Sequence, residues 1–457
     1  MINETNNIIL SHEEDSLDES PRKLATVRTV KSVDAIDGAD FIELVKFEDI
    51  HWQCIASKGD YKVGTKAIFW EIDRFLKKDE RYDPILAKCV KTMKGEEGYR
   101  IRSLRLRNTL SQGFSMKLSD FPEIDQSIET NSDVTLATGT KLWQAPVMGG
   151  RFGFNIGQSA GVFPSHLGVP KTDQERIQNI GRRDMLDLFA HLWEVTEKVD
   201  GTSATYICHK SNDSEEYKFI VCSRNLQIKE DGEQIIEYRE AIGDDEAPID
   251  TDIQRKDGRW FRKKTKKEVV RSVYWEMARN YALRERLTNY CVENKRSLAL
   301  QGEIVGPGIQ NNRLGLSEAA LLVFDLFDIE THRYVNHQDR MDIITELNRH
   351  NPSEAKLIEH VPFLGIEAIS PNLGMIQSAV RKLEAAIDSE TTEDAKHWGI
   401  FMEHIMDMTV QKLLCKADGQ VFTGHKFPRE GIVYKSILNP QKSFKIISNL
   451  FLLKLKD

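Results

Sequence analysis

The chain has 457 residues, more than one hydrophobic core usually supports, so its length predicts two or three domains. Its composition, 40% hydrophobic and 29% charged, is that of a soluble globular protein. No apolar run approaches the roughly eighteen residues of a spanning helix, which argues against a membrane role. A net charge of -8 at pH 7 excludes a uniformly basic surface but allows local basic strips that bind phosphates.

The first residues of the chain are acidic. Residues 1–20 contain no Lys or Arg, and their acids are Glu4, Glu13, Glu14, Asp15, Asp18 and Glu19. Because such a composition buries little surface, we predict a disordered acidic tail over residues 1–22. The tail lacks the features of a secretory signal, and the cysteines show neither a C-x-x-C pair nor a zinc-like spacing. We therefore expect an intracellular protein, cytoplasmic or nuclear, with reduced thiols.

Residues 23–121 alternate short apolar segments with turns. The expected strands cover residues 41–47, 51–56, 65–70 and 99–106. Several short strands within about 100 residues predict an OB-like β-barrel, a frequent nucleic-acid-binding module. A basic strip in this module fits either an RNA-backbone contact on one strand face or a solvated surface. The strip consists of Arg100, Arg102, Arg105 and Arg107.

Residues 122–170 are polar and then rich in Gly and Pro, which predicts a linker and long loops between two domains. Beyond Pro170, Thr172 and Glu175 have capping-box spacing, so a helix is predicted to start there and to run through Ile177. Residues 171–457 form the second predicted domain.

The second domain mixes strands and helices in a pattern typical of an α+β fold with antiparallel sheets. The expected strands cover residues 191–197, 202–209, 217–222, 298–304, 321–329 and 431–436. The expected helices lie near residues 268–290, 338–350 and 376–415. We interpret about residues 335–415 as a helical insertion without an assigned role.

Three lysines stand in the pattern K-x-D-G, which can present an amine at the floor of a nucleotide pocket: Lys198, Lys229 and Lys416. Lys198 lies between two apolar, strand-like segments, whereas Lys229 lies in a polar turn. Lys416 has too little chain after it for the rest of such a site. A nucleophilic amine must be held and partly desolvated, so the sequence context favours Lys198.

An ordered series of motifs follows Lys198. In chain order it consists of Ser223-Arg224-Asn225, Gln301-Gly302-Glu303-Ile304, Phe324 to Ile329, Glu430-Gly431-Ile432-Val433-Tyr434-Lys435 and Ser443-Phe444-Lys445. This series resembles the covalent nucleotidyltransferase superfamily of ATP-dependent ligases and capping enzymes. The resemblance implies an enzyme that uses ATP and Mg²⁺ or Mn²⁺.

The resemblance also implies a role for each cation. Lys198 would attack the α-phosphate of ATP and carry AMP. Its neighbour Glu197 would belong to the nucleotide-binding residues. Lys445 would touch the α-phosphate, and Arg224 would orient a phosphate or the RNA end. Because a free lysine has a pKa of about 10.4, a neighbouring cation and a metal ion are needed to favour the neutral nucleophile.

For the remaining motif residues the resemblance implies contacts with the nucleoside and the metal. Glu303 would contact the ribose, Phe324 would stack on adenine, and Glu430 would help to bind the divalent metal, which prefers oxygen ligands. Taken singly, Glu430 could also be a surface ion-pair partner and Phe324 a core residue. Phe327, three positions away, is an alternative for the aromatic role.

Two features distinguish this chain within the superfamily. DNA ligases and capping enzymes typically continue the motif as K-x-D-G-x-R, where this chain has Ser203, and they place an OB domain after the last lysine motif. Here only 12 residues follow Lys445 and the OB-like module comes first. That order resembles the Deinococcus-type RNA ligases, which seal 3′-OH and 5′-phosphate ends at nicks. The alternatives are a DNA ligase, a capping guanylyltransferase, or a catalytically inactive nucleic-acid-binding relative.

We therefore expect an ATP-dependent RNA ligase that acts through lysyl-AMP and RNA-adenylate. Its expected partner is RNA with nicked or paired ends, possibly on a DNA or RNA template, without a membrane or a stable protein partner. A basic run over residues 255–271 suits either RNA contact or a solvated loop. Many relatives have a second lysine where this chain has Ile447, and Lys435 or Lys442 could replace it.

Overall fold

A computed structural model gives the fold. It describes residues 23–144, 159–211, 215–230, 232–243, 246–249, 251–254, 259–270, 272–349, 352, 354–369, 373–389 and 391–455. The predicted acidic tail, residues 1–22, lies outside the described residues. The chain divides into two compact units, one of residues 1–48 and 52–145, the other of residues 49–51 and 146–457. Within the described ranges, no helix is both long enough and apolar enough to span a membrane.

The first unit is built mainly from short strands. They are β1 (Ala25–Ala35), β2 (Ile42–Phe47), β3 (Gln53–Ser57), β4 (Lys66–Trp70), β5 (Arg74–Lys77), β6 (Val90–Met93), β7 (Glu96–Arg100), β8 (Ser103–Leu106), β9 (Thr109–Gln112), β10 (Phe114–Lys117) and β11 (Lys141–Leu142), with one short helix, α1 (Asp83–Leu86). The main sheet has the order β10-β4-β1-β2-β3, a second sheet has the order β11-β5-β7-β6, and β8 pairs with β9.

The main sheet of this unit curls until its edge strands approach each other. The Cys54 Sγ in β3 lies 3.3 Å from the Ser115 Oγ in β10, and the backbone N–H of Ile55 donates to the Ser111 Oγ in β9 at 3.0 Å. Buried Val45 alternates with half-exposed neighbours along β2, as expected for a strand with one face on a core. The predicted OB-like barrel is confirmed.

The basic strip of this unit does not lie on one strand face. β7 ends at Arg100, which is half-buried 3.4 Å from Asp73 and lies over the ring of Trp143. Arg107 has a positive φ of 46° and, with Asn108, forms the turn between β8 and β9. The expectation of a single strand face is therefore wrong, because a turn and a strand end intervene.

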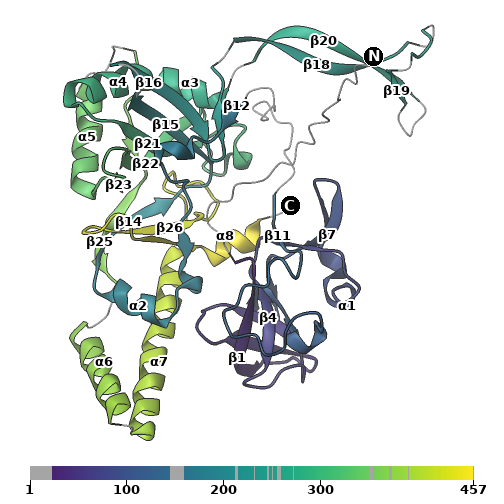
Figure 1. Cartoon of the computed structure of the whole chain (residues 1–457), viewed down its shortest axis with the longest axis vertical. Coiled ribbons are helices and arrows are strands. Elements are labelled where there is room, and N and C mark those ends of the chain that lie inside the picture. The colour runs from purple at the N-terminus through teal and green to yellow at the C-terminus, as the bar shows by residue number, and fades with distance from the viewer. Residues whose placement is uncertain are drawn as a thin grey trace, which may run out of the picture. The chain divides into compact units, whose positions relative to one another are not determined.

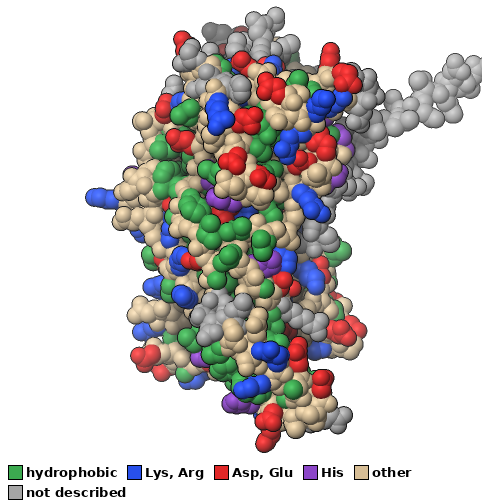
Figure 2. Space-filling view, turned by 90° about the vertical axis from the view of Figure 1, so that its left-hand side faces the viewer, with side chains coloured by type: hydrophobic (Ala, Val, Ile, Leu, Met, Phe, Trp, Pro, Cys, Tyr) green, Lys and Arg blue, Asp and Glu red, His purple; other side chains and the backbone are tan. Residues whose placement is uncertain are grey.

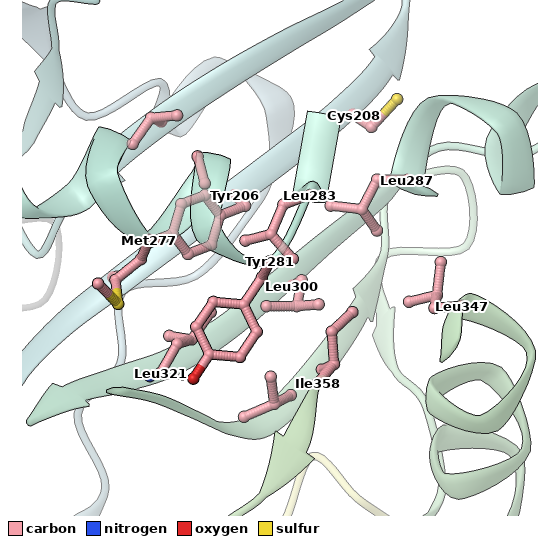
Figure 3. Packing of buried hydrophobic residues seen from close by; sticks show 14 of the residues in the cluster. Tyr206, Cys208, Met277, Tyr281, Leu283, Leu287, Leu300, Leu321, Leu347 and Ile358 are labelled. Carbon is pink, nitrogen blue, oxygen red and sulfur yellow. Dashed lines mark hydrogen bonds between the residues drawn. The ribbon is translucent and has the colours of Figure 1, made fainter. Parts of the chain in front are cut away.

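The larger sheet of the second unit carries three helices on one face. Its strands run in the order β12 (Ser159–Val162), β17 (Leu226–Ile228), β16 (Tyr217–Ser223), β15 (Thr202–Lys210), β21 (Leu298–Val305), β22 (Ala320–Asp328) and β23 (Arg333–Tyr334), and β24 (Glu359–His360) pairs with β22. The helices are α3 (Val273–Asn280), α4 (Leu283–Asn294) and α5 (His337–Arg349). Figure 3 shows Leu283 and Leu287 packed with Tyr206 and Leu300 in their common core.

The smaller sheet of this unit has five strands and its own helical layer. Its order is β13 (Glu175–Arg176), β27 (Ser443–Ile447), β26 (Gly431–Ser436), β14 (Leu192–Lys198) and β25 (Phe363–Ala368). The helices of this layer are α2 (Arg182–Phe189), α6 (Leu373–Asp388) and α7 (Thr392–Ala417), and a short helix, α8 (Asn449–Lys454), follows β27. Trp193 and Phe444 pack edge to face on each other and share a second core with Met406 and Leu413 of α7. Figure 1 shows α2, α6 and α7 below this sheet and α3, α4 and α5 beside the larger one. The α+β fold with mostly antiparallel sheets is confirmed.

The segment predicted as a helical insertion, about residues 335–415, also contributes strands. α5, α6 and α7 belong to it, but β24 joins the larger sheet and β25 forms an edge of the smaller one. Phe363 and Ile366 of β25 are half-exposed, and Figure 2 shows apolar side chains gathered at the height where Figure 1 places β25. The segment is therefore integrated into both sheets, because its strands pair with β22 and β14.

A long antiparallel hairpin projects from the larger sheet (Figure 1). It consists of β18 (Gly232–Ala241) and β20 (Trp260–Val270), with β19 (Ile253–Gln254) beside β20. β20 carries part of the basic run, whereas Arg255, Lys256 and Arg271 lie outside the described residues. The helix predicted near residue 268 begins only at Val273, because residues 268–270 still belong to β20.

The α-helix predicted from the capping-box spacing does not form over residues 171–180, where the structure has a short strand and then one 3-10 turn, Ile177–Asn179. Glu175 and Arg176 form β13, which pairs in parallel with Phe444 and Lys445 of β27. The Thr172 Oγ1 lies 2.7 Å from the Ser203 Oγ instead of capping a helix. The prediction failed because Ser203 binds the Thr172 hydroxyl and β27 pairs with the backbone of Glu175, which keeps this stretch extended.

Candidate active site

A cavity of about 370 Å³ lies in the second unit and is lined by strands of both its sheets. All seven residues predicted for the site line it: Glu197, Lys198, Arg224, Glu303, Phe324, Glu430 and Lys445. They come from positions up to 248 residues apart in the sequence, counted from Glu197 to Lys445 (445 − 197). The fold therefore brings the ordered motifs together in one place.

Strand alternation builds the floor of this cavity. Glu194, Thr196 and Lys198 are two residues apart on β14, so they share one strand face, and all three line the cavity. β26 pairs with β14 so that Lys435 lies opposite Glu194 and Val433 opposite Thr196. At about 3.3 Å per residue, the ends of this floor lie about 13 Å apart, with Lys198 at one end.

Two glycines of the motifs allow the backbone to pack closely at the Lys198 end. A Cβ on Gly201 would lie 2.3 Å from the carbonyl oxygen of Ile304, and one on Gly431 would lie 2.1 Å from that of Ile446. Any larger residue would push β15 from β21 or β26 from β27. The glycine of K-x-D-G is thus required by close approach of the strands that carry the site.

Lys198 is held by an acidic neighbour. Its Nζ lies 2.7 Å from the Glu430 Oε1, and only a quarter of its side chain is exposed. Burial by itself lowers the pKa of Lys198, but the charges of Glu430, Glu303 and Asp200 outweigh burial and raise its pKa above the ordinary value. Without ligands, the site therefore holds this amine as an ammonium ion, and the expected neutral form requires a change at Glu430.

The carboxylates around Lys198 repel one another. Burial, together with the charges of Glu430 and Asp200, raises the pKa of Glu303 to about 8. Burial and Glu430 raise the pKa of Asp200 to about 6, although Arg313 forms an ion pair with Asp200. Crowded oxygen donors of this kind suit a hard divalent cation, which would relieve their repulsion. Among the described residues, no group of three or more His, Cys, Asp or Glu side chains forms a metal site on its own.

Two cations lie elsewhere on the wall of the cavity, and one acid holds both. The Lys445 Nζ donates to the Asp173 Oδ1 at 2.6 Å, and the Arg224 Nη2 lies 2.9 Å from the Asp173 Oδ2. Burial lowers the pKa of Lys445 to about 8, although Asp173 opposes this effect. Asp173 was not predicted as a site residue, because the stretch around it was interpreted as the start of a helix.

A bulge decides which aromatic residue of the 324–329 segment reaches the cavity. The pairing of β21 with β22 shifts between Gln301 and Gly302, so that Phe324 is the extra residue of β22. Such a bulge re-aims the side chain at the bulged position. Phe324 lines the cavity, whereas Phe327 is buried and packs against Tyr334 at a ring distance of 5.2 Å. The structure therefore supports the choice of Phe324 over Phe327.

Glu197 and the two rejected lysines have other surroundings. The Glu197 carboxylate accepts a hydrogen bond of 3.2 Å from the backbone N–H of Phe422, so it also fixes the chain before Glu430. Lys229 is exposed, and Lys416 forms an ion pair with Glu367; neither lysine lines the cavity. Of the three K-x-D-G lysines, the cavity therefore includes only Lys198.

The far end of the floor contains a buried network of charges that the sequence did not reveal. The Arg340 Nη2 donates to the Glu194 Oε2 at 2.6 Å, and Lys435 forms an ion pair with Asp325. All four residues line the cavity, and Arg340 comes from α5 in the segment read as an insertion. Lys442 instead pairs with Asp187 and does not line the cavity. Lys435 is thus the candidate replacement for the missing second lysine.

Comparisons with known proteins agree with this geometry. A family model described as RNA ligase matches residues 191–447, and a model described as an OB-fold domain matches residues 24–118. A solved variant of the Naegleria gruberi RNA ligase with AMP and Mn is 28% identical, covers 94% of this chain and 98% of its own, and has a TM-score of 0.68. Another variant of that enzyme, with ATP and Mn, is also 28% identical, covers 95% of this chain and 100% of its own, and has a TM-score of 0.69. A search of curated proteins found no match.

Proposed function

The chain belongs to the RNA ligase family, and from that premise we propose that it seals 3′-OH and 5′-phosphate ends of RNA at nicks in a duplex. It uses ATP and a divalent metal ion, as in the Naegleria gruberi structures with ATP or AMP and Mn. One observation carries the proposed mechanism: Lys198 lies in a cavity that also holds Glu430, Lys445 and Arg224.

We assign the nucleophile to Lys198. Its amine attacks the α-phosphorus of ATP, a P–N bond forms, the bond to the β-phosphate oxygen breaks, and pyrophosphate leaves. The amine must first lose its proton, and the ion pair with Glu430 opposes that loss. Mg²⁺ or Mn²⁺, held by Glu430, would neutralise this carboxylate and polarise the phosphate. Once Glu430 no longer stabilises the ammonium ion, burial favours the neutral amine.

Lys445 and Arg224 supply positive charge where the phosphoryl oxygens gain negative charge. Both line the same cavity as Lys198, so they can contact the α-phosphate or the 5′-phosphate of the RNA. In the second step the RNA 5′-phosphate attacks lysyl-AMP and the P–N bond breaks. In the third step the 3′-OH attacks the RNA-adenylate and AMP leaves.

We propose that Phe324 stacks on the adenine of ATP and that Glu303 contacts its ribose. Phe324 is partly buried and lines the cavity wall, where an aromatic ring can stack on a flat ligand. Glu303 faces Ser203 across the β15–β21 ladder, near the Lys198 end of the floor. In this proposal the nucleoside binds between the two sheets, with its phosphate toward Lys198.

For RNA, we propose two contact surfaces that lie outside the cavity. The β18–β20 hairpin carries Lys263 and Lys264, both exposed, although Lys264 pairs with Glu240. Arg262 in the same strand is engaged by Asp252 and Glu246, so it serves the hairpin itself. The second surface is the β8–β9 hairpin of the OB module, where the arginines are exposed. Both surfaces offer cations to a phosphate backbone.

The proposed nucleophile is tested by incubation with α-labelled ATP and Mg²⁺, followed by a denaturing gel. We expect covalent label on the wild type, loss of label in Lys198→Ala, and retained label in Lys229→Ala and Lys416→Ala. The last two are matched controls, because each removes a lysine from an identical K-x-D-G pattern outside the cavity. Label in Lys198→Ala would refute the assignment, and label from GTP alone would indicate a capping enzyme.

A further inference from the structure

A short segment, residues 170–176, crosses from one sheet of the second unit to the other, and we call it the strap. At its start, the carbonyl oxygen of Pro170 accepts a hydrogen bond of 2.8 Å from the Gln301 Nε2 of β21. The Thr172 Oγ1 lies 2.7 Å from the Ser203 Oγ of β15. At its end, Glu175 and Arg176 pair with β27 of the smaller sheet. The strap is therefore fixed on both sides of the cavity.

Asp173 lies in the middle of the strap, between these anchors. Its two oxygens are shared between two cations, Lys445 at 2.6 Å and Arg224 at 2.9 Å. All three side chains line the cavity, and one third of Asp173 is exposed. A carboxylate that accepts from two cations presents them with the charge and the paired oxygens that a phosphate group also presents.

We propose that Asp173 positions Lys445 and Arg224 in the nucleotide-free enzyme and that phosphate oxygens of ATP take its place on these two cations. This inference rests on the proposed function, because it assumes that the cavity binds ATP. It makes Asp173 a positioning residue, which acts through Lys445 and Arg224. ATP then binds against a competing internal anion, at a site whose cations are already held in place.

The charges around Lys445 give this exchange a dependence on pH. Lys445 faces Asp173 and Arg176 from the strap and Lys198 from β14, and Asp173 links it to Arg224. Asp173 is the anion of this group, so its removal lowers the pKa of Lys445 below its present value of about 8. Below that pH Lys445 keeps its charge, and above it the amine becomes neutral and holds phosphate less well.

The test compares Asp173→Asn with the wild type in single-turnover formation of the labelled protein over a range of ATP concentrations. At about pH 6.5, below the pKa of about 8 that Lys445 has in the wild type, we expect the half-saturating ATP concentration of the variant to be about five- to tenfold lower, and to change more than the maximal rate. At about pH 8.5 the advantage should disappear or reverse, because the variant loses the Lys445 charge first.

Two further variants separate this role from mere support of the strap. Thr172→Val removes the anchor to Ser203 without changing charge, and we expect no gain in ATP affinity from it. Asp187→Asn removes an acid that pairs with Lys442 outside the cavity, and it should behave like the wild type. If the half-saturating ATP concentration of Asp173→Asn at the lower pH is unchanged or raised, this inference is overturned and the proposed function still stands. A wild type without label would refute the proposed function as well.

Discussion

The bulge at Phe324 predicts different consequences for two phenylalanines that are three residues apart. Phe324→Ala removes a partly buried ring from the cavity wall, whereas Phe327→Ala removes a ring that is 3% exposed in a core. Base-aromatic stacking contributes about 1–3 kcal/mol, so Phe324→Ala should raise the half-saturating ATP concentration by about 5- to 150-fold. Phe327→Ala should keep the half-saturating ATP concentration within about twofold of the wild-type value, because the Phe327 ring does not line the cavity.

The stability of the two variants should follow the opposite order. Removal of a fully buried phenylalanine costs about 3–5 kcal/mol, and about half that loss is expected at Phe324, since its ring is only partly buried. The assay pairs urea unfolding with single-turnover labelling at 25 °C, where both variants remain folded. A larger rise in half-saturating ATP for Phe327→Ala than for Phe324→Ala would refute the assignment of the bulge.

Three further predictions concern charged groups. The pKa of Glu303, about 8, exceeds its ordinary value of 4.5, so between these two pH values the folded state binds a proton that the unfolded state has lost. The stability that this proton contributes is present at low pH and is lost as the pH rises toward 8. The melting temperature of Glu303→Gln, measured without metal, should therefore depend less on pH between about 4.5 and 8 than that of the wild type. Arg340→Met leaves Glu194 buried without its main partner and should lower the unfolding free energy by about 3–5 kcal/mol in urea titrations, so an unchanged midpoint would contradict the network. Replacing Lys263 and Lys264 by Gln should reduce the slope of log affinity for duplex RNA against log salt by about 1.4–1.8, and an unchanged slope would dismiss the hairpin as an RNA contact.

The elements that the sequence predicted well are those with strong local patterns. The strand expected over residues 431–436 coincides with β26, and the one expected over residues 217–222 differs from β16 by one residue. Apolar strands bounded by turns fold as the pattern indicates, because burial in a sheet agrees with their local preference. The choice of Lys198 among three matching lysines followed from the same argument, since flanking strands place a residue on a sheet.

The elements that the sequence did not predict depend on distant partners. Thr172 and Glu175 have helix-start spacing, but Ser203 and β27 bind this stretch in an extended form. Likewise, Glu194 and Arg340 are 146 residues apart, and no local pattern joins a strand residue to one on a helix of the insertion. Propensity is a weak prior that tertiary contacts override.

The departure at Ser203 and the strap have one physical explanation. In relatives with the longer motif an arginine stands at this position, but here a short hydroxyl side chain on β15 lies 2.7 Å from Thr172 and anchors the strap. An arginine could not keep that contact, so the strap with Asp173 would have to move. The guanidinium that lines the cavity near the strap is that of Arg224, which follows β16 and is held by Asp173. We therefore expect Ser203→Arg to displace the strap from β15 without restoring the phosphate site.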